Sequence, residues 1–140
     1  MSLTALGFDF GQKRIGVAIG QTLTGNARAL LTLNNRNGAP DWGAISALIE
    51  EWRANILVVG IPRHMDGTEH EMTLAARRFG NRLAGRYNLP VYTVDERLTS
   101  VEAEAELADR GRRYTKEDVD KLAAQYILQA WLDQNPTSDD

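Results

Sequence analysis

A single carboxylate, Asp9, interrupts an apolar stretch near the start of the chain, at residues 5–10. Alternation along a strand places Phe8 and Phe10 on one face and Asp9 on the other, beside small residues. Burying an acid costs free energy unless another group compensates its charge. Taken alone, Asp9 is explained equally well as a turn aspartate that caps the Gly11–Gln12 bend. Its role therefore depends on whether other acids reach the same place.

Two further positions carry acids in an apolar context. Asp95 and Glu96 directly follow the apolar stretch 89–94, and Asp120 shares a helical stripe with the apolar residues at 123, 124, 127 and 131. Each acid alone is better explained by capping or by exposure to solvent. Three acids in one packed edge are harder to explain structurally, because adjacent carboxylates repel and raise one another's pKa.

Divalent cations would remove this repulsion. A cluster of carboxylate oxygens without His or Cys suits Mg²⁺ or Mn²⁺. Two such ions about 3.5 to 4 Å apart can activate a water and stabilise the leaving oxygen of a phosphodiester. The acids therefore predict metal-dependent phosphoryl chemistry with two bound ions.

The apolar periodicity predicts the elements that position these acids. Strands are expected in a hairpin over residues 6–20, at 27–33, at 56–60 and at 89–94, and helices at 41–52, 68–87, 99–109 and 115–131. Three strands in succession favour an antiparallel meander, and strands separated by helices are usually parallel. The prediction is an α/β fold with a five-stranded mixed sheet, three antiparallel strands then two parallel in the order 3-2-1-4-5, flanked by helices.

Three sequence patterns indicate where helices begin. Each has a Thr followed three residues later by an acid, which is the spacing of a capping box. The pairs are Thr68 with Glu71, Thr99 with Glu102, and Thr115 with Asp118. The last pair explains Asp118 as a cap and leaves Asp120 without such a role.

The expected topology brings the acids together. If the first, fourth and fifth strands are parallel neighbours, their carboxyl ends lie along one edge of the sheet, where open sheets place their sites. Asp9 and the 95–96 pair lie at those ends, and the last helix must begin near the same edge, which brings Asp120 close. Alternation lets only one of Asp95 and Glu96 share the face of Asp9, and the pattern does not choose between them.

Length and composition limit the class of protein. A chain of 140 residues, 43% of them apolar, is expected to form one domain over residues 1–135 with a frayed tail at 136–140. Without Cys, a leader segment or a membrane-spanning run, we expect a cytoplasmic protein. The net charge of −3 gives no general attraction to nucleic acid, so such binding needs a local basic surface.

Basic side chains provide candidates for this surface. Arg78, Arg82 and Arg86 recur every four residues on one face of the expected helix, where a solvated helix face is an equally good explanation. The full set of candidate phosphate contacts is Lys13, Arg78, Arg82, Arg86, Arg97, Arg112 and Arg113. His64 and His70 are expected to be solvated.

Four segments taken together resemble the YqgF family, also called RuvX. They are FDFGQKRIGVAIG, GIPRHMDGTEH, VDERLTS and VDKLAAQYIL, in this order along the chain. The resemblance implies an RNase H-like fold, related to the RuvC-type Holliday-junction resolvases, and a nuclease proposed to process the 5′ end of pre-16S ribosomal RNA in ribosome biogenesis. It implies Asp9, Glu96 and Asp120 as catalytic and metal-binding acids, with Asp95 as second choice. Members often carry Ser or Thr after the last Asp, where this chain has Lys121.

The resulting hypothesis is a hydrolase whose three acids hold two Mg²⁺ or Mn²⁺ ions while water attacks a backbone phosphorus in line, leaving a 5′-phosphate and a 3′-hydroxyl. Structured RNA is the favoured partner, and branched DNA, cut as by a Holliday-junction resolvase, is the next hypothesis. Two competing hypotheses are a non-catalytic nucleic-acid-binding accessory protein and an actin-like ATPase, which needs two lobes where 140 residues supply one. Monomer and homodimer are both open, and no membrane partner is expected.

Overall fold

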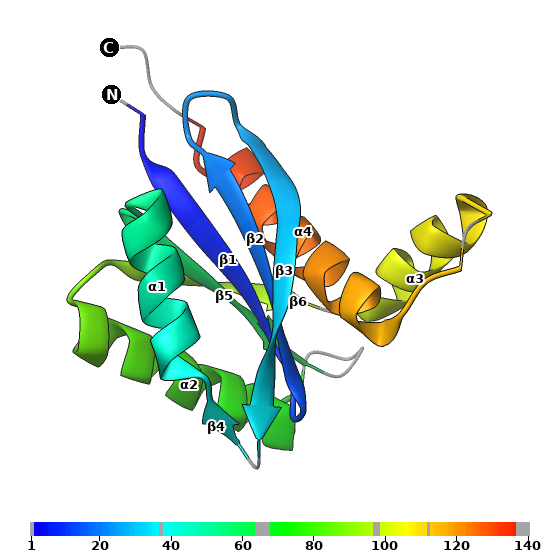
Figure 1. Ribbon diagram of the computed structural model, residues 1–140, viewed down its shortest axis with the longest axis horizontal. Coiled ribbons are helices and arrows are strands. Elements are labelled where there is room, and N and C mark those ends of the chain that lie inside the picture. The colour runs from blue at the N-terminus through cyan, green and yellow to red at the C-terminus, as the bar shows by residue number, and fades with distance from the viewer. Residues whose placement is uncertain (1, 37, 64–67, 97–98, 112, 137–140) are drawn as a thin grey trace.

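The computed structural model describes residues 2–36, 38–63, 68–96, 99–111 and 113–136, which form one mixed sheet with helices on both faces (Figure 1). The strands are β1 (Thr4–Phe10), β2 (Arg14–Gln21), β3 (Asn26–Arg36), β4 (Ala39–Pro40), β5 (Ile56–Pro62) and β6 (Val91–Glu96). The helices are α1 (Trp42–Trp52), α2 (Glu71–Tyr87), α3 (Thr99–Asp109) and α4 (Lys116–Gln134). Beyond residue 136, the expected tail lies outside the described residues.

The strands lie in the order β4-β3-β2-β1-β5-β6. The first three strands form an antiparallel meander, and β5 and β6 continue the sheet parallel to β1. The predicted order 3-2-1-4-5 is therefore confirmed for the five main strands. The predicted number of strands is one too few, because β4 lies between the strand predicted at 27–33 and the helix predicted at 41–52, where no element was predicted.

β4 is a two-residue strand at the edge of the sheet. Asn35 pairs with Pro40 and Arg36 with Ala39, so the chain folds back directly after β3. The turn uses Gly38 with a φ of 74°, a left-handed conformation that glycine adopts without steric cost. Two residues cannot show hydrophobic alternation, and so the sequence pattern does not reveal this strand.

Helices α1 and α2 cover one face of the sheet, and α4 crosses the other (Figure 1). Alternate residues of β1 divide between the two faces. Leu6 and Phe8 pack toward α1 and α2, whereas Ala5 packs toward α4. Helix α3 packs against α4 through Ala103 and extends away from the sheet.

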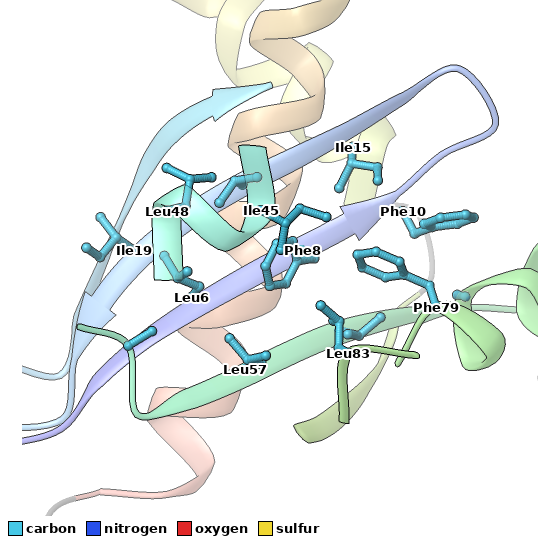
Figure 2. Packing of buried hydrophobic residues seen from close by; sticks show 14 of the residues in the cluster. Leu6, Phe8, Phe10, Ile15, Ile19, Ile45, Leu48, Leu57, Phe79 and Leu83 are labelled. Carbon is cyan, nitrogen blue, oxygen red and sulfur yellow. The ribbon is translucent and has the colours of Figure 1, made fainter. Parts of the chain in front are cut away.

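The larger part of the core lies between the sheet and the α1–α2 layer (Figure 2). The ring of Phe79 in α2 packs against Phe8 and Phe10, with centroid distances of 5.6 and 4.8 Å. Ile45 of α1 and Leu83 of α2 are fully buried in the same cluster. Since each large apolar side chain contributes about 1.5–3 kcal/mol on burial, this cluster holds β1 firmly against two helices. The helices predicted at 41–52 and 68–87 are confirmed as α1 and α2, the second beginning three residues later than predicted.

Two of the three predicted capping boxes can be compared with the structure. In α4, Thr115 and Asp118 form the predicted box, with reciprocal side-chain to backbone hydrogen bonds of 2.9 and 3.2 Å. The predicted Thr68–Glu71 box is wrong, because α2 begins at Glu71 and its cap is His70. Helix α3 begins at Thr99, whose side chain lies outside the described residues.

His70 replaces the expected Thr at the start of α2. Its Nδ1 accepts a hydrogen bond from the Met72 N–H at 3.2 Å, and its own N–H donates to Oγ1 of Thr73 at 3.0 Å. The Thr73 hydroxyl donates in turn to the carbonyl oxygen of Pro62, which ties the helix to the end of β5. An imidazole nitrogen here does the work of a Ser or Thr oxygen, so the usual capping rule does not detect it. His70 is therefore a structural cap rather than a solvated side chain, and His64 lies outside the described residues.

Across the described residues, every helix is too short or too polar to cross a lipid bilayer.

Candidate active site

Asp9 lies on the face of β1 that α4 covers. Its neighbours Phe8 and Phe10 point to the opposite face, as alternation predicts. Two residues before Asp9, a Cβ placed on Gly7 would lie 3.3 Å from the backbone oxygen of Ala124 in α4. Helix α4 therefore approaches the small residues of β1 closely.

Gly16 on β2 brings Asp120 to Asp9. The two residues Gly16 and Asp9 are paired across the antiparallel ladder. A Cβ placed on Gly16 would lie only 1.9 Å from the backbone oxygen of Asp120, so α4 can lie this close only over a glycine. The start of α4 therefore rests on the strand residue directly opposite Asp9.

Gly60 on β5 makes room for Glu96 on the other side of Asp9. The parallel pairing of β1 with β5 reaches Phe8 and Val59, so Asp9 and Gly60 are the next residues along the two strands. Glu96 extends over this position from β6, and its Oε2 would lie 2.6 Å from a Cβ on Gly60. Glycines on both neighbouring strands thus leave the space that the acids occupy. Sequence reasoning missed both, although a lone Gly inside an apolar strand often marks a close approach.

The register of β6 decides which acid at its end meets Asp9. Tyr92 lies on the α4 face, with its ring 5.2 Å from the ring of Trp131. Val94 packs into the same α4 cluster. Because strand residues alternate, Glu96 shares this face.

Asp95 points the other way. It is exposed, and Nε of Arg63 donates to its Oδ1 at 3.1 Å. The structure therefore brings Glu96 to Asp9 and places Asp95, the second choice, outside the cluster.

The three acids are coupled electrostatically. Burial raises the pKa of Asp9 well above its usual value, and the charges of Glu96 and Asp120 raise it further. Acids from β6 and α4 thus lie within electrostatic range of Asp9 at the carboxyl end of β1. Their roles in catalysis and metal binding stay predictions.

Arg14 holds Asp120 in place. Its Nε donates to Oδ2 of Asp120 at 2.5 Å, and the two side chains are 27% and 19% exposed. Arg14 begins β2, two residues before Gly16, so the same strand supports the backbone of α4 and binds its acid. Sequence reasoning missed this ion pair, because it joins residues 106 positions apart without any local pattern.

The described residues contain no group of three or more His, Asp or Glu side chains that could together hold a metal ion, so the predicted three-acid site is not assembled in this structure. Asp9 and Glu96 are nevertheless neighbours, and Oε2 of Glu96 is buried without a hydrogen-bond partner in the described part of the chain. Hard divalent cations take oxygen ligands only. A buried, unpaired carboxylate oxygen beside a second buried acid fits Mg²⁺ or Mn²⁺.

Glu96 makes the metal-free protein sensitive to pH. Burial raises its pKa from 4.5 to about 7. Because the pKa of Glu96 is higher in the folded state, its protonated carboxyl contributes about 3 kcal/mol of stability. This contribution is fully present below pH 4.5 and is lost as the pH rises to about 7. In EDTA at pH 8, we expect Glu96→Gln to have a free energy of unfolding up to this much larger than that of the wild type, measured by urea denaturation. Near pH 4.5 the two proteins should be equally stable. An equal difference at both pH values would contradict the assignment.

The basic candidates on α2 separate into two groups. Arg78 and Arg82 line a pocket together with Lys13. Arg86 instead lies over the ring of Trp42, with its guanidinium carbon 4.3 Å from the ring centroid. The regular spacing therefore does not make one continuous phosphate-binding ridge.

The remaining basic candidates lie near the start of α4 or outside the described residues. Arg113 lines a smaller pocket of about 260 Å³ beside Tyr114. Lys121, which follows Asp120, pairs with Asp118 at 3.5 Å. Arg97 and Arg112 lie outside the described residues.

A protein-family model described as "RuvX: Holliday junction resolvase" matches residues 3–134. The chain belongs to the RuvX family. A relative from Pseudomonas fluorescens (strain SBW25) is 54% identical over 133 residues, which cover 93% of this chain and 92% of the relative. A relative from Coxiella burnetii is 51% identical over 133 residues, which cover 95% and 94%. Both are provisionally named pre-16S rRNA nuclease.

Solved structures relate the RuvX fold to that of resolvases. The fowlpox virus Holliday junction resolvase superposes with a TM-score of 0.56 at 12% identity, covering 94% of this chain and 99% of the other. Thermus thermophilus RuvC, in complex with a Holliday junction substrate, superposes with a TM-score of 0.55 at 18% identity, covering 94% of each chain. At such identities the similarity concerns the fold alone, and it confirms the predicted RNase H-like architecture.

Proposed function

We propose that this RuvX chain is a metal-dependent nuclease that hydrolyses phosphodiester bonds, with processing of pre-16S ribosomal RNA as its role. Family membership and the names of the relatives support a nuclease. The observation that carries the proposal is the placement of Glu96 over Gly60 and of Asp120 over Gly16, on the two strands that flank Asp9, with Oε2 of Glu96 buried and without a hydrogen-bond partner among the described residues. Repulsion between these acids destabilises the fold, and a bound divalent cation would offset it.

Asp9, Glu96 and Asp120 are the residues that would hold the metal. When bound, Mg²⁺ or Mn²⁺ supplies Lewis-acid stabilisation of the phosphoryl group and lowers the pKa of water. Asp9 and Glu96 project from strands and Asp120 from a helix, so rigid elements position all three. Arg14 orients the carboxylate of Asp120 through its Nε donor. The use of two ions stays a prediction.

The decisive experiment is cleavage of a labelled structured RNA and of a four-way DNA junction, with Mg²⁺, Mn²⁺ or EDTA. We expect the RNA to be cut with either ion, giving 5′-phosphate and 3′-hydroxyl ends, and no cutting in EDTA. Cutting of the junction alone would favour a resolvase. Binding of both substrates without cutting would favour an accessory protein.

Metal binding should also be visible as stability. We expect millimolar Mg²⁺ to raise the Tm, because a ligand of the native state alone stabilises it by about 2.7 kcal/mol at a hundredfold excess over Kd. NaCl at equal ionic strength is the control for screening of surface charges. An unchanged Tm in millimolar Mg²⁺ would remove the metal from the mechanism.

A further inference from the structure

A second concave site lies on the α2 side of the sheet. This pocket has a volume of about 1110 Å³ and lies between the β1–β2 turn, the β3–β4 end of the sheet and the first half of α2. Phe10 belongs to its lining, whereas the preceding residue, Asp9, faces α4 on the other side. The pocket and the carboxylates therefore share one edge of the sheet but open on opposite faces.

The lining of this pocket is strongly basic. It contains four cations, Lys13, Arg36, Arg78 and Arg82, and a single acid, Glu71. All four cations are exposed, and none forms an ion pair with another described residue. In a chain with a net charge of −3, such a group of unpaired cations indicates a site for a polyanion.

Arg77 shows that ion pairing is available on the same helix. Its Nη1 donates to Oε1 of Glu69 at 2.7 Å. Arg78 and Arg82 lie on the neighbouring face and line the pocket instead. The lack of ion pairs at Arg78 and Arg82 is therefore confined to the side chains that line the pocket and does not extend to every Arg of α2.

The pocket also offers apolar surface. Leu74 is 53% exposed, and Met72 and Ala75 are partly exposed beside it on α2. Sites for single-stranded nucleic acid combine cations that bind the backbone with side chains, most often aromatic, on which bases stack; here the exposed apolar surface around Leu74 would serve for this contact. A duplex keeps its bases stacked inside and would use the cations alone.

The rim of the pocket is held rigid by Asn35. This residue is 2% exposed, and its Nδ2 donates to the carbonyl oxygen of Gly11 at 2.5 Å. Its backbone N–H donates to the carbonyl oxygen of Lys13 at 2.9 Å. The turn that carries Lys13 is thus fixed before a ligand binds, which lowers the entropic cost of binding.

We propose that this pocket binds a single-stranded segment of the nucleic acid next to the cleaved bond, with phosphates on the four cations and a base against Leu74. Asp9 and Phe10 are consecutive residues on opposite faces, so a strand that crosses the β1–β2 turn would reach both sites. The position of the cleaved bond rests on the proposed nuclease function. Binding in the pocket does not.

The test is fluorescence anisotropy with labelled single-stranded RNA and DNA oligonucleotides in EDTA, where no cleavage occurs. We expect Arg78→Gln/Arg82→Gln to weaken binding at least tenfold. The slope of log K against log salt should fall by about 1.4, because each phosphate contact to a single strand contributes about 0.7. Leu74→Ser should weaken oligonucleotide binding but leave inorganic polyphosphate binding unchanged.

Arg86→Gln is the matched control. It removes one positive charge from the same helix, where the double variant removes two, but Arg86 lies over Trp42 outside the pocket, so affinity should stay within about twofold of the wild type. Unchanged binding in the double variant, an equal loss in Arg86→Gln, or tighter binding of a duplex than of the single strand would each overturn the pocket. Binding here without any RNA cleavage would overturn the nuclease proposal alone, and cleavage with unchanged binding in the double variant would overturn the pocket alone.

Discussion

Asp9→Asn is expected to lose metal-dependent cleavage by more than about 100-fold, because even outer-shell partners of metal ligands contribute 10- to 100-fold. Asn keeps the shape of Asp but removes the negative charge at the centre of the cluster. The measurement is the cleavage rate of one labelled RNA at saturating Mg²⁺. Wild-type activity in this variant would refute the carboxylate mechanism.

The same substitution should stabilise the metal-free protein. Burial, followed by the charges of Glu96 and Asp120, raises the pKa of Asp9. The folded protein is therefore more stable while this carboxyl is protonated, and it loses this stability as the pH rises and the carboxyl ionises. Asn does not ionise. In EDTA at pH 8 the variant should therefore unfold at higher urea than the wild type, with the gain shrinking toward pH 4. Mg²⁺ should stabilise the wild type only, and a gain of stability at pH 4 as large as at pH 8 would contradict this account.

Asp95→Asn is the control for both effects. Asp95 is an exposed acid at the end of β6 and is paired with Arg63, outside the cluster. Its variant should keep the cleavage rate and the Mg²⁺-induced rise in Tm. Loss of cleavage in Asp95→Asn together with full activity in Glu96→Gln would show that Asp95, and not Glu96, belongs to the catalytic site.

Gly16→Ala is expected to destabilise the protein by about 3 kcal/mol or more, at the upper end of the usual cost of overpacking. The added Cβ would lie 1.9 Å from the backbone oxygen of Asp120, and backbone cannot move aside as a flexible side chain can. The start of α4 must shift away from β2, which also draws Asp120 from Asp9. Urea unfolding measures the first effect, and a smaller Mg²⁺-induced rise in Tm measures the second.

Gly85→Ala provides the matched comparison. Gly85 lies within α2, and a Cβ there meets no heavy atom within 4 Å. Ala in a helix interior is more stable than Gly by about 0.5–1 kcal/mol, so this variant should gain stability. If Gly16→Ala were as stable as the wild type, α4 would not rest on β2 as described.

The parts of the fold that depend on local periodicity could be predicted from the sequence. The alternation of Phe8, Asp9 and Phe10 gave the two faces of β1 correctly, and the stripe through Ala124 and Ile127 gave the buried face of α4. Both patterns repeat over several residues, so each residue supports the interpretation of the next.

The order of the strands was predicted, but several individual contacts between distant parts of the chain were not. Gly16 and Gly60 are needed because the backbone of Asp120 and the side chain of Glu96 pack directly against them. Arg14 is placed to bind Asp120 because α4 begins beside it. Strand alternation alone left Asp95 and Glu96 open and only the family resemblance favoured Glu96, whereas the packing of Tyr92 on Trp131 fixes the register of β6 that places Glu96 on the face of Asp9. These facts belong to the packed structure and leave no periodic trace in the chain.

Strand β1 gives consecutive residues opposite tasks, and this limits how the protein can vary in length. A shift of one residue in its pairing with β2 would turn Asp9 into the aromatic layer around Phe79 and push Phe8 and Phe10 under α4. An insertion or deletion within Thr4–Phe10 would therefore disrupt both the hydrophobic core and the acid cluster. Changes of length can be absorbed only where the chain turns, such as residues 22–25 between β2 and β3.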